Sequence, residues 1–186
     1  TVRGRSAHSA RPWQGDNAVL LAIPLLERLR ALEPRDVTID GFLFREVTSV
    51  TTAHAGRGRN VIPDAFELNV NHRFAPTTSL AVAESNLRAW IAEAAVPADV
   101  EIIDRSPAAL PFAAHPLVQR LANAGVAAVE PKQAWTDVAR FAALGVPAVN
   151  WGPGTQAQAH QPDEWTSVST LVAGRDILRS FLARSP

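Results

Sequence analysis

Histidine supplies the most reactive side chains in this sequence, because the chain has five histidines and no cysteine. Without thiolates, any metal ion must be held by His, Asp or Glu, which are harder nitrogen and oxygen ligands. His8 and His160 stand among small residues, where a ring nitrogen has room to face a cleft. His160 is a candidate metal ligand or acid–base group, with an ordinary loop histidine as the alternative. Its spacing from Glu164 would suit one helical face, but Pro162 disfavours a helix there, so the paired ligands of a zinc-protease helix are not expected.

The other three histidines have simpler interpretations. His54 stands near the end of a predicted strand and His115 at the start of a predicted helix, so both are expected to be surface or capping residues. His72 shares the apolar face of its strand, which predicts a core histidine with a satisfied hydrogen bond.

Several polar residues are candidates for binding a ligand. Arg73 lies on the polar face of a predicted strand, where its planar fork could take a carboxylate or simply be solvated. Asn60 opens a turn and serves either a ligand or only that turn. Thr136 could cap a helix whose free N–H groups favour carboxylates or phosphates. Asp137 and Arg140 are three residues apart and could pair with each other.

Length and composition set broad limits. The 186 residues suit one domain or two small ones, and the 47% hydrophobic content supports a real core. The 18 acidic and 18 basic residues balance, so we expect no nucleic acid and no membrane partner. We find no apolar run of about 18 residues, no signal peptide and no disulfide framework. These features indicate a cytoplasmic protein.

The first half of the chain has a recognisable element order. Asp16 or Asn17 is placed to cap a helix, and Pro24 should kink that helix. Apolar and polar residues alternate over Ala65–Phe74, which gives the strongest strand signal. The predicted elements are strands at 1–6, 37–39, 42–52, 65–74 and 100–103, and helices at about 17–29 and 76–91. With the neighbouring runs 37–39 and 42–52 counted as one, their order is β-α-β-β-α-β, the ferredoxin-like pattern with two helices on one sheet face and an open face suited to a second molecule.

The second half changes rhythm after a linker at Ser106–Pro111, which predicts two domains, 1–106 and 107–186. Helices and strands alternate as in a parallel α/β sheet. They are predicted at 115–123 (helix), 126–129 (strand), 136–144 (helix), 146–150 (strand) and 168–182 (helix). Because two strands do not make such a domain, we expect this chain to be a piece of a longer protein.

Three ordered motifs together resemble one family, the di-zinc aminoacylase/carboxypeptidase hydrolases. Gly4–Pro12 followed by Gly15–Ala18 is similar to the start of that family's dimerisation (lid) domain. Asn60–Asp64 and the strand ending in Arg73 are similar to the next part of the lid. Thr136–Phe141, then Gly152–Gly154 and His160, are similar to the closing catalytic segment. The resemblance covers essentially the whole chain and implies an α/β protein: a ferredoxin-like lid followed by the C-terminal part of a catalytic domain.

The resemblance also implies a mechanism and partners. Two zinc ions, with cobalt as an alternative, would share a water and lower its pKa for attack on an amide. His160 would ligate one zinc, and His8 would reach into the partner subunit of a homodimer and donate to the oxyanion. Asn60, Arg73 and Thr136 would hold a small dicarboxylate amide substrate.

The closing segment most resembles members that remove succinate from N-succinyl-LL-2,6-diaminopimelate in lysine biosynthesis. Deacylation of acetylornithine or peptidase activity is the alternative within the family, and a non-catalytic dimerisation module is the alternative outside it. The family's catalytic glutamate and other metal ligands would precede Thr1. Since each zinc needs three or four ligands, the chain alone is predicted to be inactive.

Overall fold

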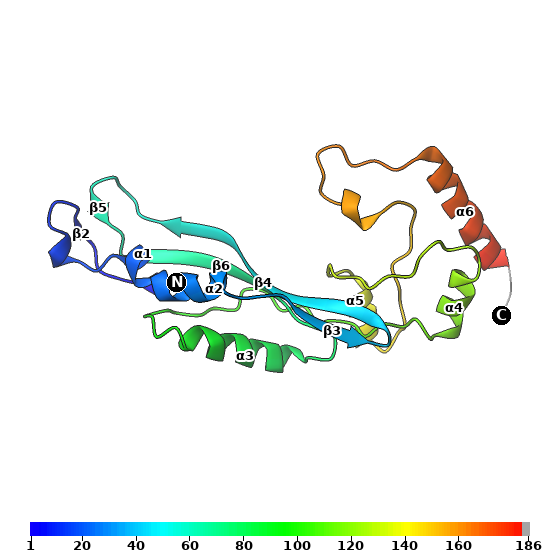
Figure 1. Cartoon of the computed structure of the whole chain (residues 1–186), viewed down its shortest axis with the longest axis horizontal. Helices are drawn as coiled ribbons and strands as arrows, with labels where there is room; N and C mark the ends of the chain where they lie inside the picture. Colours follow the sequence, from blue (N-terminus) through cyan, green and yellow to red (C-terminus); the bar gives the residue numbers. More distant parts are fainter. Residues whose placement is uncertain (184–186) are drawn as a thin grey trace. The chain divides into compact units, whose positions relative to one another are not determined.

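The computed structural model describes residues 1–183 and separates into two compact units (Figure 1). Unit 1 contains Thr1–Thr38 and Leu43–Ala108. Unit 2 contains Ile39–Phe42 and the residues from Ala109 on. No helix within the described residues is long and apolar enough to cross a membrane.

A four-stranded sheet is the framework of unit 1. Its strands are β1 (Val2–Arg3), β6 (Ala65–Arg73), β4 (Phe42–Ala55) and β3 (Arg35–Ile39), in that spatial order. β6 is antiparallel to both neighbours, with a register shift in β4 between Val50 and Thr52. The strand predicted at 65–74 is confirmed as β6, and its alternation shows at the ends, where Phe66 is buried and Glu67 and Arg73 are exposed, whereas Leu68 to His72 are all half-buried.

The ferredoxin-like order is confirmed except for its last strand. The predicted strand at 100–103 is wrong, since the chain meets β1 earlier, through an isolated bridge between Ala98 and Val2 and an ion pair of Asp99 with Arg3. Beyond that bridge, the Val100 carbonyl accepts a hydrogen bond from the Arg88 side chain (2.9 Å), not from a neighbouring strand. The edge of the sheet beside β1 is therefore covered by a single bridge at Ala98, where a four-residue strand was expected.

Two helical segments cover the same face of this sheet. The first is split into α1 (Ala18–Leu21) and α2 (Ile23–Arg30), which agrees with the predicted effect of Pro24. The Asn17 side chain caps α1 by accepting from the Val19 amide (3.0 Å). The second, α3 (Leu80–Ala92), is capped by Ser79 and runs along the sheet (Figure 1). Their shared core contains Val2, Ala18, Ala22, Leu25, Phe66, Ile91 and Ala94.

A second, smaller sheet stands at the end of unit 1 away from β3 (Figure 1). It pairs β2 (Ala7–His8) with β5 (Val61–Ile62). A short 3₁₀ turn, η1 (Pro12–Gln14), follows β2.

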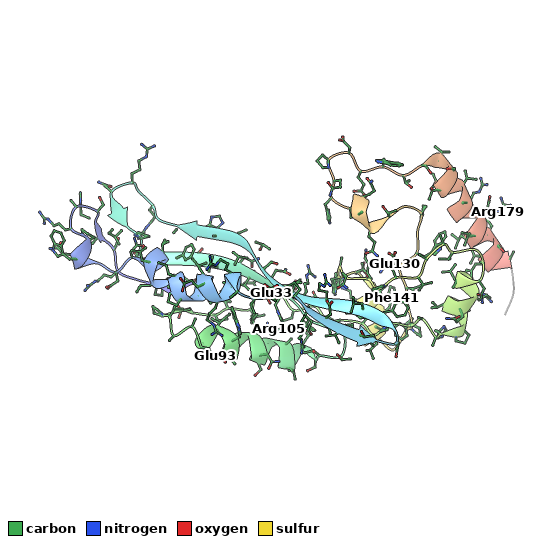
Figure 2. All side chains as sticks on the ribbon, viewed as in Figure 1. Glu33, Glu93, Arg105, Glu130, Phe141 and Arg179 are labelled. Carbon is green, nitrogen blue, oxygen red and sulfur yellow. The ribbon has the colours of Figure 1, made fainter. Side chains whose placement is uncertain are left out.

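Unit 2 is built from helices and irregular chain. Its elements are α4 (Pro116–Ala122), α5 (Val138–Ala143), η2 (Gln156–Gln158) and α6 (Val168–Ala183). The strands predicted at 126–129 and 146–150 are wrong, because neither run has a hydrogen-bonded partner strand within the described residues. Val146 is 47% exposed, so an apolar run suited to a sheet interior remains uncovered. Figure 2 shows Phe141 on α5, and this phenylalanine is also half exposed.

Candidate functional site

The structure brings His8 and Asn60 together at the end of unit 1. His8 on β2 lies opposite Val61 on β5. The next residue, Ser9, donates its backbone N–H to the Asn60 carbonyl (2.9 Å). Both His8 and Asn60 are exposed, so their side chains are accessible. Two residues identified separately from the sequence thus form one small surface.

The His8 ring is oriented by its own turn. Its Nδ1 accepts a hydrogen bond from the Ala10 amide (3.0 Å), and its carbonyl accepts from the Arg11 amide (2.8 Å). An accepting Nδ1 carries no proton, so the neutral ring has its proton on Nε2. Nε2 of the exposed His8 ring is therefore a hydrogen-bond donor, which is the form needed to meet a developing negative charge.

The loop that carries His8 is closed at its base. Arg5 and Asp16 exchange two backbone hydrogen bonds (both 2.8 Å), and their side chains form an ion pair (3.3 Å). Gly4 and Gly15 permit this close approach, since a Cβ on Gly15 would lie 2.5 Å from the Arg5 oxygen and 2.7 Å from Ala7 Cβ. Gly15 has an extended backbone (φ −133°), so space and not backbone conformation requires glycine there.

Further hydrogen bonds attach this loop to the segment after β5. The Gly4 amide donates to Asp64 and the Ala18 amide to Pro63, both at 2.9 Å. The Ser6 hydroxyl donates to the Ile62 carbonyl (3.2 Å). The His8 loop and the turn of Asn60 are consequently one rigid piece.

Arg73 is not part of this surface in the same chain. It ends β6 and lies opposite Val47, whereas Ala65 at the other end of β6 lies near the small sheet. A strand of nine residues is about 26 Å long at roughly 3.3 Å per residue. The Arg73 side chain is exposed and has no ion pair among residues 1–183.

His72 has the predicted hydrogen-bond partner, but it is half-buried and lies outside the buried core. Its Nδ1 lies 2.8 Å from the Thr48 hydroxyl across the β4–β6 pair, and its ring stacks on Phe74. Burial lowers the pKa of His72 below its ordinary range, and the Glu46 carboxylate partly opposes that shift. Glu46 is itself engaged by Arg35 (2.6 Å). The cluster ties strands β3, β4 and β6 together, and burial of the ring disfavours its charged form.

Four other residues have the structural roles expected of them. His115 caps α4 by accepting from the Leu117 amide (3.3 Å), and His54 is exposed near the end of β4. Asp137 and Arg140 form the expected pair (3.4 Å).

In unit 2, Thr136 is paired with a residue that the sequence did not single out for binding. The Asn150 amide donates to the Thr136 hydroxyl (2.9 Å). The predicted capping role of Thr136 is wrong, because Asp137 holds the N-cap position of α5 and no side chain caps it. Asn150 ends an apolar run, and polar residues at such positions are the signal that would have identified it.

His160 follows η2 in an exposed loop. Its backbone has a φ of +64°, which is uncommon for a residue other than glycine. It is not helical, so the prediction that His160 and Glu164 do not share a helical face is confirmed. Within the described part of the chain, no three His, Asp or Glu side chains are grouped to hold a metal ion. These residues alone therefore do not fit a zinc site, which needs three or four ligands.

Comparison with known proteins agrees with this architecture. Residues 1–99 match the family of peptidase dimerisation domains. A Mycobacterium tuberculosis protein provisionally named succinyl-diaminopimelate desuccinylase is 42% identical over 98% of this chain and 51% of its own length. The succinyl-diaminopimelate desuccinylase of Corynebacterium glutamicum is 35% identical over 98% of this chain and 50% of its own. The chain thus spans about half the length of these relatives.

A solved structure gives the same fold. The aminopeptidase PepT of Bacillus cereus superposes with a TM-score of 0.67 over 97% of this chain and 48% of its own. The two sequences are only 18% identical, so this likeness concerns the fold alone.

Proposed function

Because this chain belongs to the family of peptidase dimerisation domains, we propose that it is the C-terminal portion of an amide hydrolase that acts on N-succinyl-LL-2,6-diaminopimelate. The substrate is suggested by the names of the M. tuberculosis and C. glutamicum relatives. Residues 1–106 would form the dimerisation lid, and residues 107–186 would complete a catalytic domain in the cytoplasm.

The observation that carries the proposal is that the backbones of His8 and Asn60 lie side by side, because His8 is opposite Val61 and Ser9 N–H donates to the Asn60 carbonyl. When water attacks an amide carbonyl, the carbonyl oxygen becomes an oxyanion, and donors placed around it lower the barrier. His8 would donate from Nε2–H, and the exposed Asn60 side chain, in the neighbouring turn, would add an amide group. Since the β2–β5 pair and the bond from Ser9 to Asn60 hold the two backbones together, both residues would enter the same active site.

The distance along β6 indicates where that active site lies. Arg73 lies roughly one strand length from His8, so one substrate cannot touch both residues of a single chain. In a homodimer formed through the lid, His8 and Asn60 of one subunit would join Arg73 and Thr136 of the other. Arg73 would bind a substrate carboxylate with its guanidinium fork.

The metal requirement points to residues outside this chain. Zinc, or cobalt in its place, would supply an activated water when bound. His160 would be this chain's ligand to it, and the other ligands would come from the rest of the intact protein. The 186-residue chain alone is accordingly expected to be inactive.

The test uses the intact protein, meaning this chain within its full reading frame. We expect it to release succinate from N-succinyl-LL-2,6-diaminopimelate and the 186-residue chain to release none. His8→Ala should lower kcat by about 10²–10³, the usual effect of removing one oxyanion donor. An intact protein that leaves the succinyl substrate uncleaved would refute the assignment.

Mixed dimers test the shared site. His8→Ala and His160→Ala subunits are each expected to be inactive alone. If His8 acts across the dimer, random mixing restores about a quarter of the activity, because half of the dimers are hybrids with one complete site. A mixture as inactive as its components would show that His8 acts within its own subunit.

A further inference from the structure

The β4–β5 loop beside His8 and Asn60 is unusually cationic. Residues 56–60 read Gly-Arg-Gly-Arg-Asn, and the loop turns at Gly56, whose φ is +76°. The Val61 amide then donates to the Gly58 carbonyl (3.3 Å). That bond closes a tight turn with Arg59 and Asn60 at its two central positions. Arg59 therefore sits at the tip, next to the proposed substrate-contacting amide.

A second tight turn faces the first. The bond from Arg11 N to the His8 carbonyl places Ser9 and Ala10 at its centre, and Ser9 N donates to Asn60. Arg11 is the third residue after His8 and ends this turn, whereas Arg59 directly precedes Asn60. One arginine flanks each of the two candidate site residues.

The carboxylates near this surface are already in use. Asp16 pairs with Arg5 (3.3 Å), and Asp64 pairs with Arg57 (2.9 Å). Arg11 and Arg59 are exposed, and within residues 1–183 neither has an ion pair. The chain as a whole has no net formal charge. The positive charges of Arg11 and Arg59 are therefore a local excess on this surface, in a chain whose total charge is balanced.

We propose that Arg11 and Arg59 form a cationic rim that binds the free carboxylate of the substrate's acyl group. This assignment rests on the proposed function, since Arg11 and Arg59 belong to the same two turns as the donors that would meet the scissile carbonyl. A succinyl group places a carboxylate two carbons beyond that carbonyl, within reach of a long arginine side chain. An acetyl group has no such carboxylate. The rim is therefore a selectivity device for anionic acyl groups.

The kinetic test compares two substrates that differ only in the acyl group, N-succinyl- and N-acetyl-LL-2,6-diaminopimelate, on the intact protein. Arg59→Gln and Arg11→Gln should each lower kcat/KM about tenfold for the succinyl substrate, the usual effect of losing one charge-assisted hydrogen bond. The acetyl substrate should change less than about twofold. Arg57→Gln is the matched control, because it removes the same charge from the same loop but from an existing ion pair.

Salt gives a second kinetic readout. Exposed charges are screened beyond about 10 Å at 0.1 M salt. The wild-type preference for the succinyl substrate should fall as salt rises, and the Arg11→Gln/Arg59→Gln protein should show no such fall. Equal losses on both substrates, or an Arg57→Gln effect as large as that of Arg59→Gln, would overturn the proposal.

Direct binding separates the rim from the proposed function. Succinate added to the 186-residue chain at constant ionic strength should shift the side-chain NMR signals of Arg11 and Arg59 but not of Arg57. Neutral succinamide should shift none of them. If the intact protein cleaves neither substrate, the proposed function fails and this titration alone decides. Unshifted Arg11 and Arg59 signals, or an equal shift at Arg57, would then reject the rim.

Discussion

Replacing Gly15 by alanine should loosen the His8 loop, and the structure gives the size of the effect. The new Cβ would lie 2.5 Å from the Arg5 oxygen and 2.7 Å from Ala7 Cβ, whereas ordinary contact begins near 3.4 Å. The chain around Arg5 must therefore move by roughly 1 Å, and overpacking of this kind costs about 1–3 kcal/mol. The lower conformational entropy of unfolded alanine offsets about 0.4–1 kcal/mol. A net loss of about 1–2 kcal/mol remains.

Two measurements on the 186-residue chain check this loss. The unfolding temperature of unit 1 should fall by roughly 5–10 °C, since about 1 kcal/mol shifts a domain of this size by 4–8 °C. Amide exchange at Arg5 and Asp16 should accelerate, because their two mutual hydrogen bonds must lengthen. Gly58→Ala is the control, as its Cβ would meet its nearest neighbour at 3.6 Å. A Gly15→Ala protein as stable as the wild type, with protected Arg5 and Asp16 amides, would refute the close-approach argument.

Three more predictions concern stability. Asn17→Ala should destabilise unit 1 by about 0.5–2 kcal/mol through loss of the α1 cap, whereas Asn17→Asp keeps an accepting oxygen and should change little in urea unfolding. Burial makes the pKa of His72 lower in the folded protein than in the unfolded chain, so the unfolded chain takes up a proton first as the pH falls. The stability that His72 contributes should therefore be full above about pH 6.5 and decrease as the pH drops towards the lowered folded pKa. His72→Gln should abolish this pH dependence of stability, and an unchanged dependence would mean that another group causes it. Arg28→Ala should cost about 1 kcal/mol in thermal unfolding, because its guanidinium lies 4.9 Å from the Trp90 ring centre; Arg28→Lys should restore only part, and full restoration would argue against ring stacking.

Local chemistry made much of unit 1 predictable. Alternation identified β6, the Asn17 side chain marked the start of α1, and Pro24 separated α1 from α2. These features depend on neighbouring residues, which the sequence displays directly. The pairing of β2 with β5 was not predictable in this way, because strands of two residues carry no periodic signal. His8 and Asn60 were found separately, and only the register shows that they are neighbours.

The errors in unit 2 have a physical cause. The runs at 126–129 and 146–150 have strand composition, but a strand exists only when another chain segment accepts its hydrogen bonds. The described residues offer none, so Val129 and Val149 remain 50% and 41% exposed. The composition of these runs suits a strand, but within the described residues they form none because no other segment pairs with them.

The joining of the His8 loop to the Asn60 turn also affects how this surface can change during evolution or engineering. An insertion in either segment would move both side chains, because Ser9 donates to Asn60 and Gly4 donates to Asp64. These are backbone bonds, so grafting residues 4–18 alone, or residues 56–64 alone, from a homologue with a loop of different length would displace them. Swapping the two segments together preserves them. The smallest transferable module of this surface is thus discontinuous in sequence, and libraries aimed at new acyl selectivity should vary both segments jointly.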